Sequence, residues 1–295
     1  MNKANEKSFK KGVYFVFLTF LLSWTLSEVY FFSGGTLYSP GFYIISILFM
    51  FMPMTAVIIV QKFIYNEKLI KPLEISFKLN RWFIASWLLP LLMVFTATAI
   101  SLLIPDTELT SDPSVSNVIR HYNYDATAIE KMKEQSSSLP VHPFLLSLLT
   151  GLLAGFTINA LAAFGEELGW RGLLQNELSF LGFWKSSIII GMIWGIWHAP
   201  LILRGYNYPG NPALGIIMMI LLCVLLAPIF SFMRIRSKSV LASAVIHGSF
   251  NAFAGLPLLV LKGGHEFLVG MMGLSGMAAL LLVNIFIYFY RNREF

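Results

Sequence analysis

The sequence has a single cysteine and very little charge. Only 12% of its 295 residues are charged, whereas 57% are hydrophobic, and the mean hydropathy is +0.71. The solitary Cys223 excludes an intrachain disulfide framework and any zinc site built from several cysteines. A water-soluble domain of this size would need more charged surface, so the composition is typical of a polytopic membrane protein. We interpret residues 1–295 as one integral membrane domain.

Two signatures of hydrolytic enzymes are also absent. No serine lies in a G-x-S-x-G turn and Cys223 has no motif around it, so nucleophilic catalysis has little support. No H-E-x-x-H segment is present, so the usual sign of a zinc protease is missing.

The net charge of +6 does not indicate a nucleic-acid partner, because the basic residues form short clusters beside apolar segments. Membrane proteins fix their topology with clusters of this kind.

Eight apolar segments are long enough to be membrane helices. The first, Val13–Phe32, is longer than the core of a signal peptide and has no small-residue cleavage pattern after it. We therefore predict an uncleaved first span. The other spans are expected at approximately 42–61, 82–104, 144–165, 186–203, 213–233, 240–261 and 267–290. The predicted fold class is all-α, with about eight transmembrane helices that enclose an intramembrane cavity.

The basic residues predict the orientation of these spans. With a cytoplasmic N-terminus and an even number of spans, only five of the 21 lysines and arginines fall outside: Arg120, Lys131, Lys133, Arg204 and Lys262. The positive-inside rule therefore places both termini in the cytoplasm. The lysine-rich and phenylalanine-rich composition is typical of a bacterial chain, so we expect a multi-pass protein of a bacterial cell membrane, with membrane lipid around it.

The loop 105–143 is the one long connection between predicted spans. It carries six acidic and three basic residues and is extracytoplasmic in this topology. At this length a loop is expected to be functional or partly disordered. We interpret its histidines, His121 and His142, as ordinary surface residues, because no recognisable chemistry surrounds them.

The segment Ala163–Gly172 places two carboxylates and a guanidinium at the end of an apolar span. Charged groups inside a membrane cost about 2.5–3.5 kcal/mol each on insertion scales, and by default they mark a functional site. Glu167 and Arg171 are four residues apart and can pair along one helix. Adjacent helical residues point about 100° apart, so Glu166 lies on another face and can point into the protein. The alternative is a solvated helix end at the membrane interface.

Two later spans carry further polar side chains. His198 follows an aromatic segment, and His247 and Asn251 are four residues apart, so that both project from one face of a helix. A single intramembrane histidine or asparagine usually serves packing or hydrogen bonding between helices. The combination with two carboxylates, spread over three spans, instead favours a shared site.

These groups are suited to hydrolysis. A glutamate and a neutral imidazole that share a water can deprotonate it. A second histidine and an amide can donate hydrogen bonds to the oxyanion of a tetrahedral intermediate, where one donor contributes about 2.7–4 kcal/mol. Alternatively, Glu166, His198 and His247 can ligate Zn²⁺ and leave a position open for water. The residues by themselves leave both options open.

Three motifs, in this order and at this separation, resemble those of the CPBP family: Glu166-Glu167-x-x-x-Arg171, Trp194-x-x-x-His198 and His247-x-x-x-Asn251. The family comprises intramembrane proteases, among them the type II CAAX prenyl endopeptidases, and bacterial proteins linked to bacteriocin processing and self-immunity. The resemblance covers residues 145–255 approximately. The chain departs from the family pattern at Trp194, where phenylalanine is common.

The resemblance implies an eight-helix fold with a membrane-embedded cavity that opens toward the cytosol. It also implies three pairs of residues with separate roles: Glu166 and His198 activate the water, His247 and Asn251 form the oxyanion pocket, and Glu167 and Arg171 support them. The family is described both as glutamate-dependent and as metal-dependent. We favour metal-independent hydrolysis, with zinc as the alternative cofactor.

We therefore predict an intramembrane endopeptidase whose substrate is a membrane-associated peptide or protein. Two other functions use the same residues. The chain can be a non-catalytic immunity protein or signalling partner in the membrane, or a transporter of protons or small solutes. The replacement Glu166→Ala distinguishes the protease from the binding protein, because it abolishes proteolysis but leaves a binding function intact. A transporter instead predicts proton-coupled flux in proteoliposomes. No feature of the sequence predicts an oligomeric state.

Overall fold

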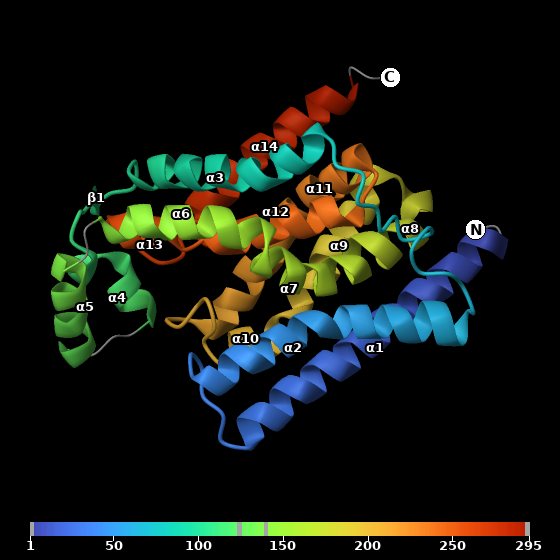
Figure 1. Ribbon diagram of the computed structural model, residues 1–295, viewed down its shortest axis with the longest axis horizontal. Coiled ribbons are helices and arrows are strands. Elements are labelled where there is room, and N and C mark those ends of the chain that lie inside the picture. The colour runs from blue at the N-terminus through green and yellow to red at the C-terminus, as the bar shows by residue number, and fades with distance from the viewer. Residues whose placement is uncertain (1–2, 123–125, 139–140, 293–295) are drawn as a thin grey trace.

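The computed structural model describes residues 3–122, 126–138 and 141–292, and it is almost entirely helical (Figure 1). The long helices are α1 (Lys3–Phe32), α2 (Pro40–Val57), α3 (Arg81–Ser101), α11 (Pro212–Ser237), α12 (Val240–Phe253) and α14 (Leu274–Asn292). The shorter helices are α4 (Asn117–Tyr122), α5 (Ala126–Ser138), α6 (Pro143–Phe156), α7 (Ile158–Glu167), α8 (Gln175–Glu177), α9 (Phe183–Trp197), α10 (Ala199–Leu203) and α13 (Leu256–Val260). The strands β1 (Thr107–Leu109) and β2 (Leu261–Gly263) pair antiparallel.

The all-α membrane fold is confirmed. In the described residues, six helical segments are long and apolar enough to cross a membrane: Asn5–Phe32, Pro40–Ile64, Arg81–Ser101, Pro212–Ser237, Val240–Val260 and Leu274–Asn292. The predicted span at 144–165 corresponds to a pair of helices, Pro143–Phe156 and Ile158–Glu177, which are bent by 47°. The predicted span at 186–203 corresponds to α9, which has 15 residues, and the short α10 that follows it.

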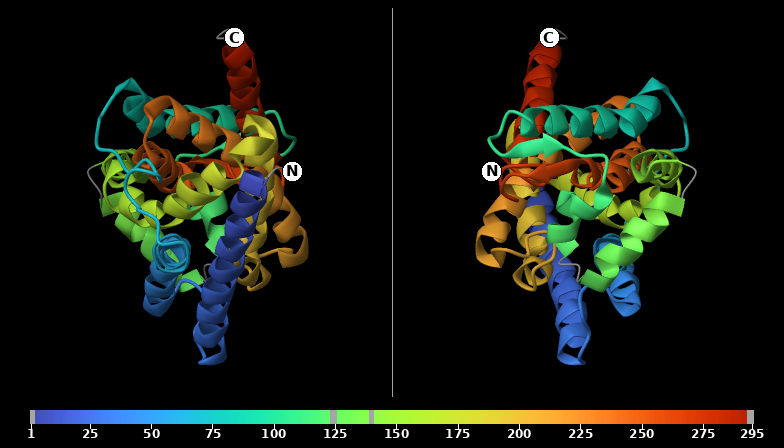
Figure 2. Two further views of the ribbon diagram at one scale, coloured as in Figure 1. Left: turned by 90° about the vertical axis from the view of Figure 1, so that its right-hand side faces the viewer. Right: turned by 90° about the vertical axis from the view of Figure 1, so that its left-hand side faces the viewer.

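The helices run between two ends of the bundle, which we call the termini end and the α4 end (Figures 1 and 2). Ion pairs join the segments at the termini end, where Lys11 contacts Glu177 at 2.8 Å and Arg234 contacts Glu74 at 3.5 Å. At the α4 end, β1 pairs with β2, and the Asn117 side chain donates a hydrogen bond to the Gly263 carbonyl at 2.8 Å. The contacts therefore fix which end of each helix lies on which side.

The long loop of the sequence prediction contains ordered structure. Between residues 105 and 143 lie β1, a short 3₁₀ turn at Pro113–Val115, α4 and α5, while residues 123–125 and 139–140 lie outside the described part. The ring of His142 binds the Ser111 carbonyl through Nε2 at 2.7 Å. This hydrogen bond joins the end of the segment to a residue near its beginning. The segment covers one end of the bundle.

The location of α9 is fixed by tryptophans at the centre of the core. Trp197 packs on Phe49 of α2, with ring centroids 4.3 Å apart, and on Trp170 at 5.8 Å. Its indole N–H donates to the Ser23 hydroxyl of α1 at 2.8 Å, and its carbonyl accepts from the Trp24 indole at 3.1 Å. Because buried aromatic N–H groups need partners, these bonds hold the end of α9 in one position.

Helix α12 packs closely against α6 and α7 because glycines lie where it crosses them. A Cβ atom added to Gly248 would meet the backbone nitrogen of Ala160 and would lie 2.6 Å from the Gly155 carbonyl oxygen. A Cβ atom added to Gly155 would in turn lie 2.9 Å from the Cα atom of Ser249. Small residues at such crossings let helix backbones pack directly in a membrane.

We therefore expect Gly248→Ala to destabilise the fold by about 1–3 kcal/mol, the usual cost of overpacking. The measurement is the thermal unfolding midpoint of the purified protein in detergent. Gly255→Ala is the matched control, because nothing lies within 4 Å of a Cβ atom at that position. Equal midpoints for the two variants would show that the α7–α12 crossing tolerates a side chain.

Candidate active site

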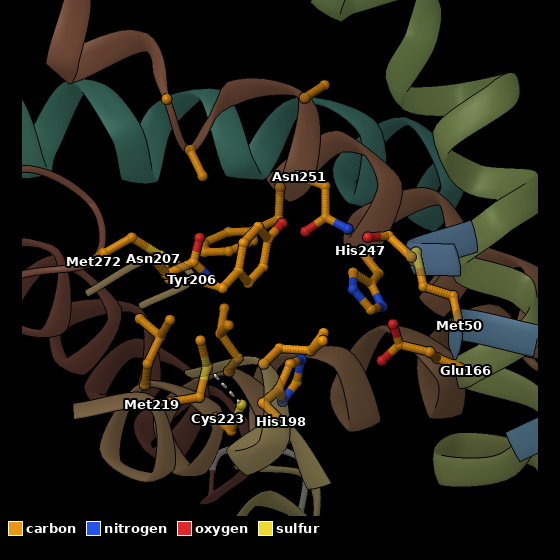
Figure 3. A pocket seen from close by; sticks show the side chains of 18 of the residues that line it. Met50, Glu166, His198, Tyr206, Asn207, Met219, Cys223, His247, Asn251 and Met272 are labelled. Carbon is orange, nitrogen blue, oxygen red and sulfur yellow. Dashed lines mark hydrogen bonds between the residues drawn. The ribbon is translucent and has the colours of Figure 1, made fainter. Parts of the chain in front are cut away.

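A cavity of about 490 Å³ lies among α2, α7, α9, α11 and α12 (Figure 3). The four side chains predicted to be catalytic all line it: Glu166, His198, His247 and Asn251. They come from three helices that are far apart in the sequence, α7, the end of α9, and α12. Glu167 and Arg171 do not line the cavity and lie behind it in the protein.

The two adjacent glutamates are deeply buried. Glu166 is 2% exposed, and Glu167 and Arg171 are fully buried. The interpretation of this segment as a solvated helix end is therefore wrong. The segment Leu168–Leu174, which directly follows α7, forms a π-helix. Such wider turns occur mostly as short insertions in α-helices and often at functional sites.

Glu167 is the centre of a buried cluster of charges. The same carboxylate oxygen, Oε1, accepts from Arg171 Nη1 at 2.9 Å and from His247 Nδ1 at 2.8 Å. The guanidinium of Arg171 also lies over the rings of Trp194 and Phe230, at 4.6 and 5.0 Å from their centroids. An i,i+4 pair between Glu167 and Arg171 was predicted from the sequence, and it is confirmed.

The bond to Glu167 determines how His247 can react. An ionised carboxylate can only accept, so the hydrogen of this bond is on Nδ1 of the imidazole. The other ring nitrogen, Nε2, is then left for the cavity that His247 lines. Nε2 accepts a proton when the ring is neutral and donates when the ring is charged, and the neighbouring carboxylate stabilises the charged ring.

Glu166 has a partner that the sequence prediction missed. The indole N–H of Trp194 donates to Glu166 Oε2 at 2.7 Å, and both side chains line the cavity. The sequence motif predicted only an aromatic residue at Trp194. Its departure from phenylalanine was the available signal, because among these two rings only indole has a hydrogen to donate.

His198 is held by the backbone of its own helix. Its Nδ1 lies 2.8 Å from the Trp194 carbonyl oxygen, and its ring packs edge-on against Trp197 at 4.9 Å. A carbonyl accepts, so Nδ1 carries the hydrogen and Nε2 has a free lone pair. Asn251 lies one helical turn beyond His247 on α12 and is exposed in the cavity.

A zinc site requires three or four donor atoms arranged around one point. Among the residues that the structure describes, no three His, Cys, Asp or Glu side chains are placed so that they could hold a metal ion. Glu166, His198 and His247 line the same cavity without forming such a set. The described residues therefore provide no preformed set of three such ligands for zinc.

Fold and site together define a multi-pass membrane protein in which several polar side chains share a cavity inside an apolar helical bundle. Residues 144–253 match the family model described as type II CAAX prenyl endopeptidase Rce1-like. A segment of 49 residues is 47% identical to a protein named CAAX prenyl protease 2 from Methanococcus maripaludis. That segment covers 16% of this chain and 18% of the archaeal protein. Both matches support the resemblance to the CPBP family that the three motifs predicted.

Breaking the charge cluster should destabilise the protein. We expect Glu167→Ala to lower the free energy of unfolding by about 3–5 kcal/mol, because Arg171 would keep a buried charge without a partner. The measurement is again thermal unfolding in detergent. The double variant Glu167→Leu with Arg171→Met should lose less than Glu167→Ala alone, since it leaves no unpaired charge.

Glu6→Ala is the matched control, because Glu6 and Lys10 form an ion pair with the same spacing on an exposed part of α1, at 2.9 Å. Exposed pairs contribute little to stability. If Glu6→Ala and Glu167→Ala shifted the midpoint equally, burial of the Glu167 pair would have no energetic role.

Proposed function

We propose that this protein is an intramembrane endopeptidase in which Glu166 and His198 activate a water molecule that hydrolyses a peptide bond. The observation that supports this most directly is the cavity, which brings Glu166, His198 and His247 together from three helices. The name of the archaeal relative, CAAX prenyl protease 2, supports proteolysis of a membrane-associated peptide or protein.

Hydrogen bonds leave one oxygen of Glu166 and one ring nitrogen of His198 available to a water molecule. Trp194 occupies one oxygen of Glu166, so the second oxygen can accept the proton of a water molecule in the cavity. His198 can accept a hydrogen bond from the same water through Nε2, because its Nδ1 is bound to a carbonyl. The hydroxide that forms attacks the carbonyl carbon of the scissile peptide bond.

His247 and Asn251 are proposed to stabilise the tetrahedral intermediate. Its oxyanion accepts hydrogen bonds from the Asn251 amide and from Nε2–H of a charged His247, whose Nδ1–H remains bound to Glu167. Glu166 then delivers its proton to the leaving nitrogen, and the C–N bond breaks. The products are a new carboxyl terminus and a new amino terminus, and Glu166 returns to its ionised state.

The first prediction from this mechanism is that Glu166→Gln loses cleavage by a factor of about 10²–10⁴, the typical contribution of a general base. Purified protein would be assayed on quenched prenyl-peptides and other membrane-associated peptides. Glu134→Gln is the control, because Glu134 is exposed on α5. Wild-type cleavage should also persist with a strong chelator present.

Full cellular function in Glu166→Gln would contradict the proposal. The chain would then be a non-catalytic immunity or signalling protein of the same family. Chelator-sensitive cleavage that added zinc restores would instead retain the protease and replace its mechanism.

The second prediction concerns Trp194. Trp194→Phe keeps an aromatic ring but removes the donor to Glu166, and a hydrogen bond to a charged group contributes about 1.5–3 kcal/mol. We expect kcat to fall about tenfold or more, with KM nearly unchanged, because Trp194 orients the base. Trp184→Phe is the control, since Trp184 lies on α9 near its start and outside the cavity. An unchanged kcat in Trp194→Phe would show that this hydrogen bond does not position Glu166.

A further inference from the structure

We propose that the connection between α2 and α3 binds anionic phospholipid, through a surface on which exposed basic and exposed apolar side chains alternate. We call residues 62–81 the strap. The structure describes all of the strap, and none of its residues lines the cavity. Lipid binding at this surface therefore does not depend on the proposed protease function.

The strap lies where two membrane-spanning segments leave the bilayer. It runs from the last turn of Pro40–Ile64 to the first residue of Arg81–Ser101, and both segments are long and apolar enough to cross a membrane. Figure 1 shows it at the termini end of the bundle, where it passes α8. The side chain of Asn176 on α8 donates a hydrogen bond to the Pro72 carbonyl at 2.7 Å. A connection in this position faces the lipid headgroups of one leaflet.

Hydrogen bonds and one buried side chain hold the strap in place. The Gln61 amide donates to the Lys68 carbonyl at 2.9 Å, and the Ser239 hydroxyl donates to the Ser76 carbonyl at 2.6 Å. Leu73, between these two points, is 2% exposed and packs in the core. Because the backbone is already ordered, a ligand of the outward side chains does not have to order it on binding.

Both acidic residues of the strap pair with basic residues of other helices. Glu67 contacts Lys11 of α1 at 2.6 Å, and Glu74 contacts Arg234 of α11 at 3.5 Å. Lys11 and Arg234 are buried, at 4% and 8% exposed. The two acids thus compensate charges inside the protein. The basic residues of the strap all remain exposed: Lys62, Lys68, Lys71, Lys78 and Arg81.

Large apolar side chains are exposed beside these basic residues. They form three groups along the chain: Lys62-Phe63, Ile70-Lys71 and Phe77-Lys78-Leu79. Phe77 is 82% exposed and Leu79 is 77% exposed, although neither belongs to a membrane span. At the boundary between headgroups and acyl chains, such apolar side chains are removed from water while basic groups reach the headgroups.

Anionic phospholipid matches both kinds of side chain at once. Its headgroup attracts lysine and arginine, each of which strengthens binding to an anionic membrane surface by about fivefold. Its acyl chains surround the phenylalanine, leucine and isoleucine side chains. A nucleic acid or an acidic protein would neutralise the basic groups and leave the apolar ones in water. A zwitterionic lipid would cover the apolar groups and leave the charges without counter-charges.

Thermal unfolding in neutral detergent measures this binding without any assay of activity. The purified protein is titrated with phosphatidylglycerol or with phosphatidylcholine of the same acyl chains, and the unfolding midpoint is followed against the mole fraction of lipid. We expect phosphatidylglycerol to raise the midpoint more, because a ligand that binds only the folded surface stabilises it. The difference should shrink at high salt, which screens exposed charges.

Removing positive charge from the strap should abolish this preference. We expect apparent affinity for phosphatidylglycerol to fall about a hundredfold, at fivefold per residue, in the triple variant Lys68→Gln, Lys71→Gln, Lys78→Gln. The matched control removes the same charge from exposed positions at the α4 end: Lys131→Gln, Lys133→Gln, Lys262→Gln. It should respond like the wild type. Equal losses in the two triple variants would show that only net charge matters and would overturn the proposal.

The apolar part of the surface is tested by Phe77→Gln, with Phe32→Gln as its control. The two phenylalanines are 82% and 84% exposed, but Phe32 lies at the far end of α1 and has no basic neighbours in the sequence. We expect Phe77→Gln to weaken apparent affinity about tenfold, as for the burial of one large apolar side chain, and Phe32→Gln to leave it unchanged. Equal effects of the two changes would remove the strap's apolar groups from the site.

Soluble glycerol phosphate distinguishes a lipid from a free phosphate. It carries the same anionic group without acyl chains, so we expect it to leave the midpoint unchanged. A rise equal to that with phosphatidylglycerol would indicate a phosphate site and would overturn the assignment to lipid. Equal midpoints of the wild-type protein in the two phospholipids would reject anionic lipid binding at the strap, whether or not the protein cleaves peptides.

Discussion

The buried ion pair between Glu167 and Arg171 is the interaction on which the rest of the site depends. Neither group can be solvated where it lies, so each charge must be compensated within the protein. The same Glu167 oxygen also binds His247 of α12, which couples the register of α7 to that of α12. Gly248 of α12, which faces Ala160 of α7, allows the two helices to come close enough for that bond.

Glu167 binds Arg171 and His247, whereas the adjacent Glu166 has different surroundings. Glu166 lies on another face of α7 and lines the cavity, where an indole N–H from α9 binds one of its oxygens. In the proposed mechanism, the second oxygen and the two imidazole Nε2 atoms are the groups left to meet a substrate. Two adjacent carboxylates thus bind different partners because they lie on different faces of the helix.

The position of α9 follows from aromatic packing more than from polar contacts. Trp197 is fixed by hydrogen bonds to α1 and by stacking on Phe49 of α2, and His198 is the next residue along the chain. The histidine is therefore placed by its neighbour in the core. This explains why α9 can be short for a membrane helix and still hold a defined end.

The sequence by itself determined the helical membrane class, the approximate spans, the Glu167–Arg171 pair and the resemblance to the family, because apolar runs, i,i+4 spacing and motif order are local properties of the chain. Only the tertiary structure decided the bond from Glu167 to His247, 80 residues away, and the Trp194 hydrogen bond to Glu166. These features depend on how helices cross and rotate against one another. Helix crossing and rotation are set by packing between distant segments, and no local pattern encodes them.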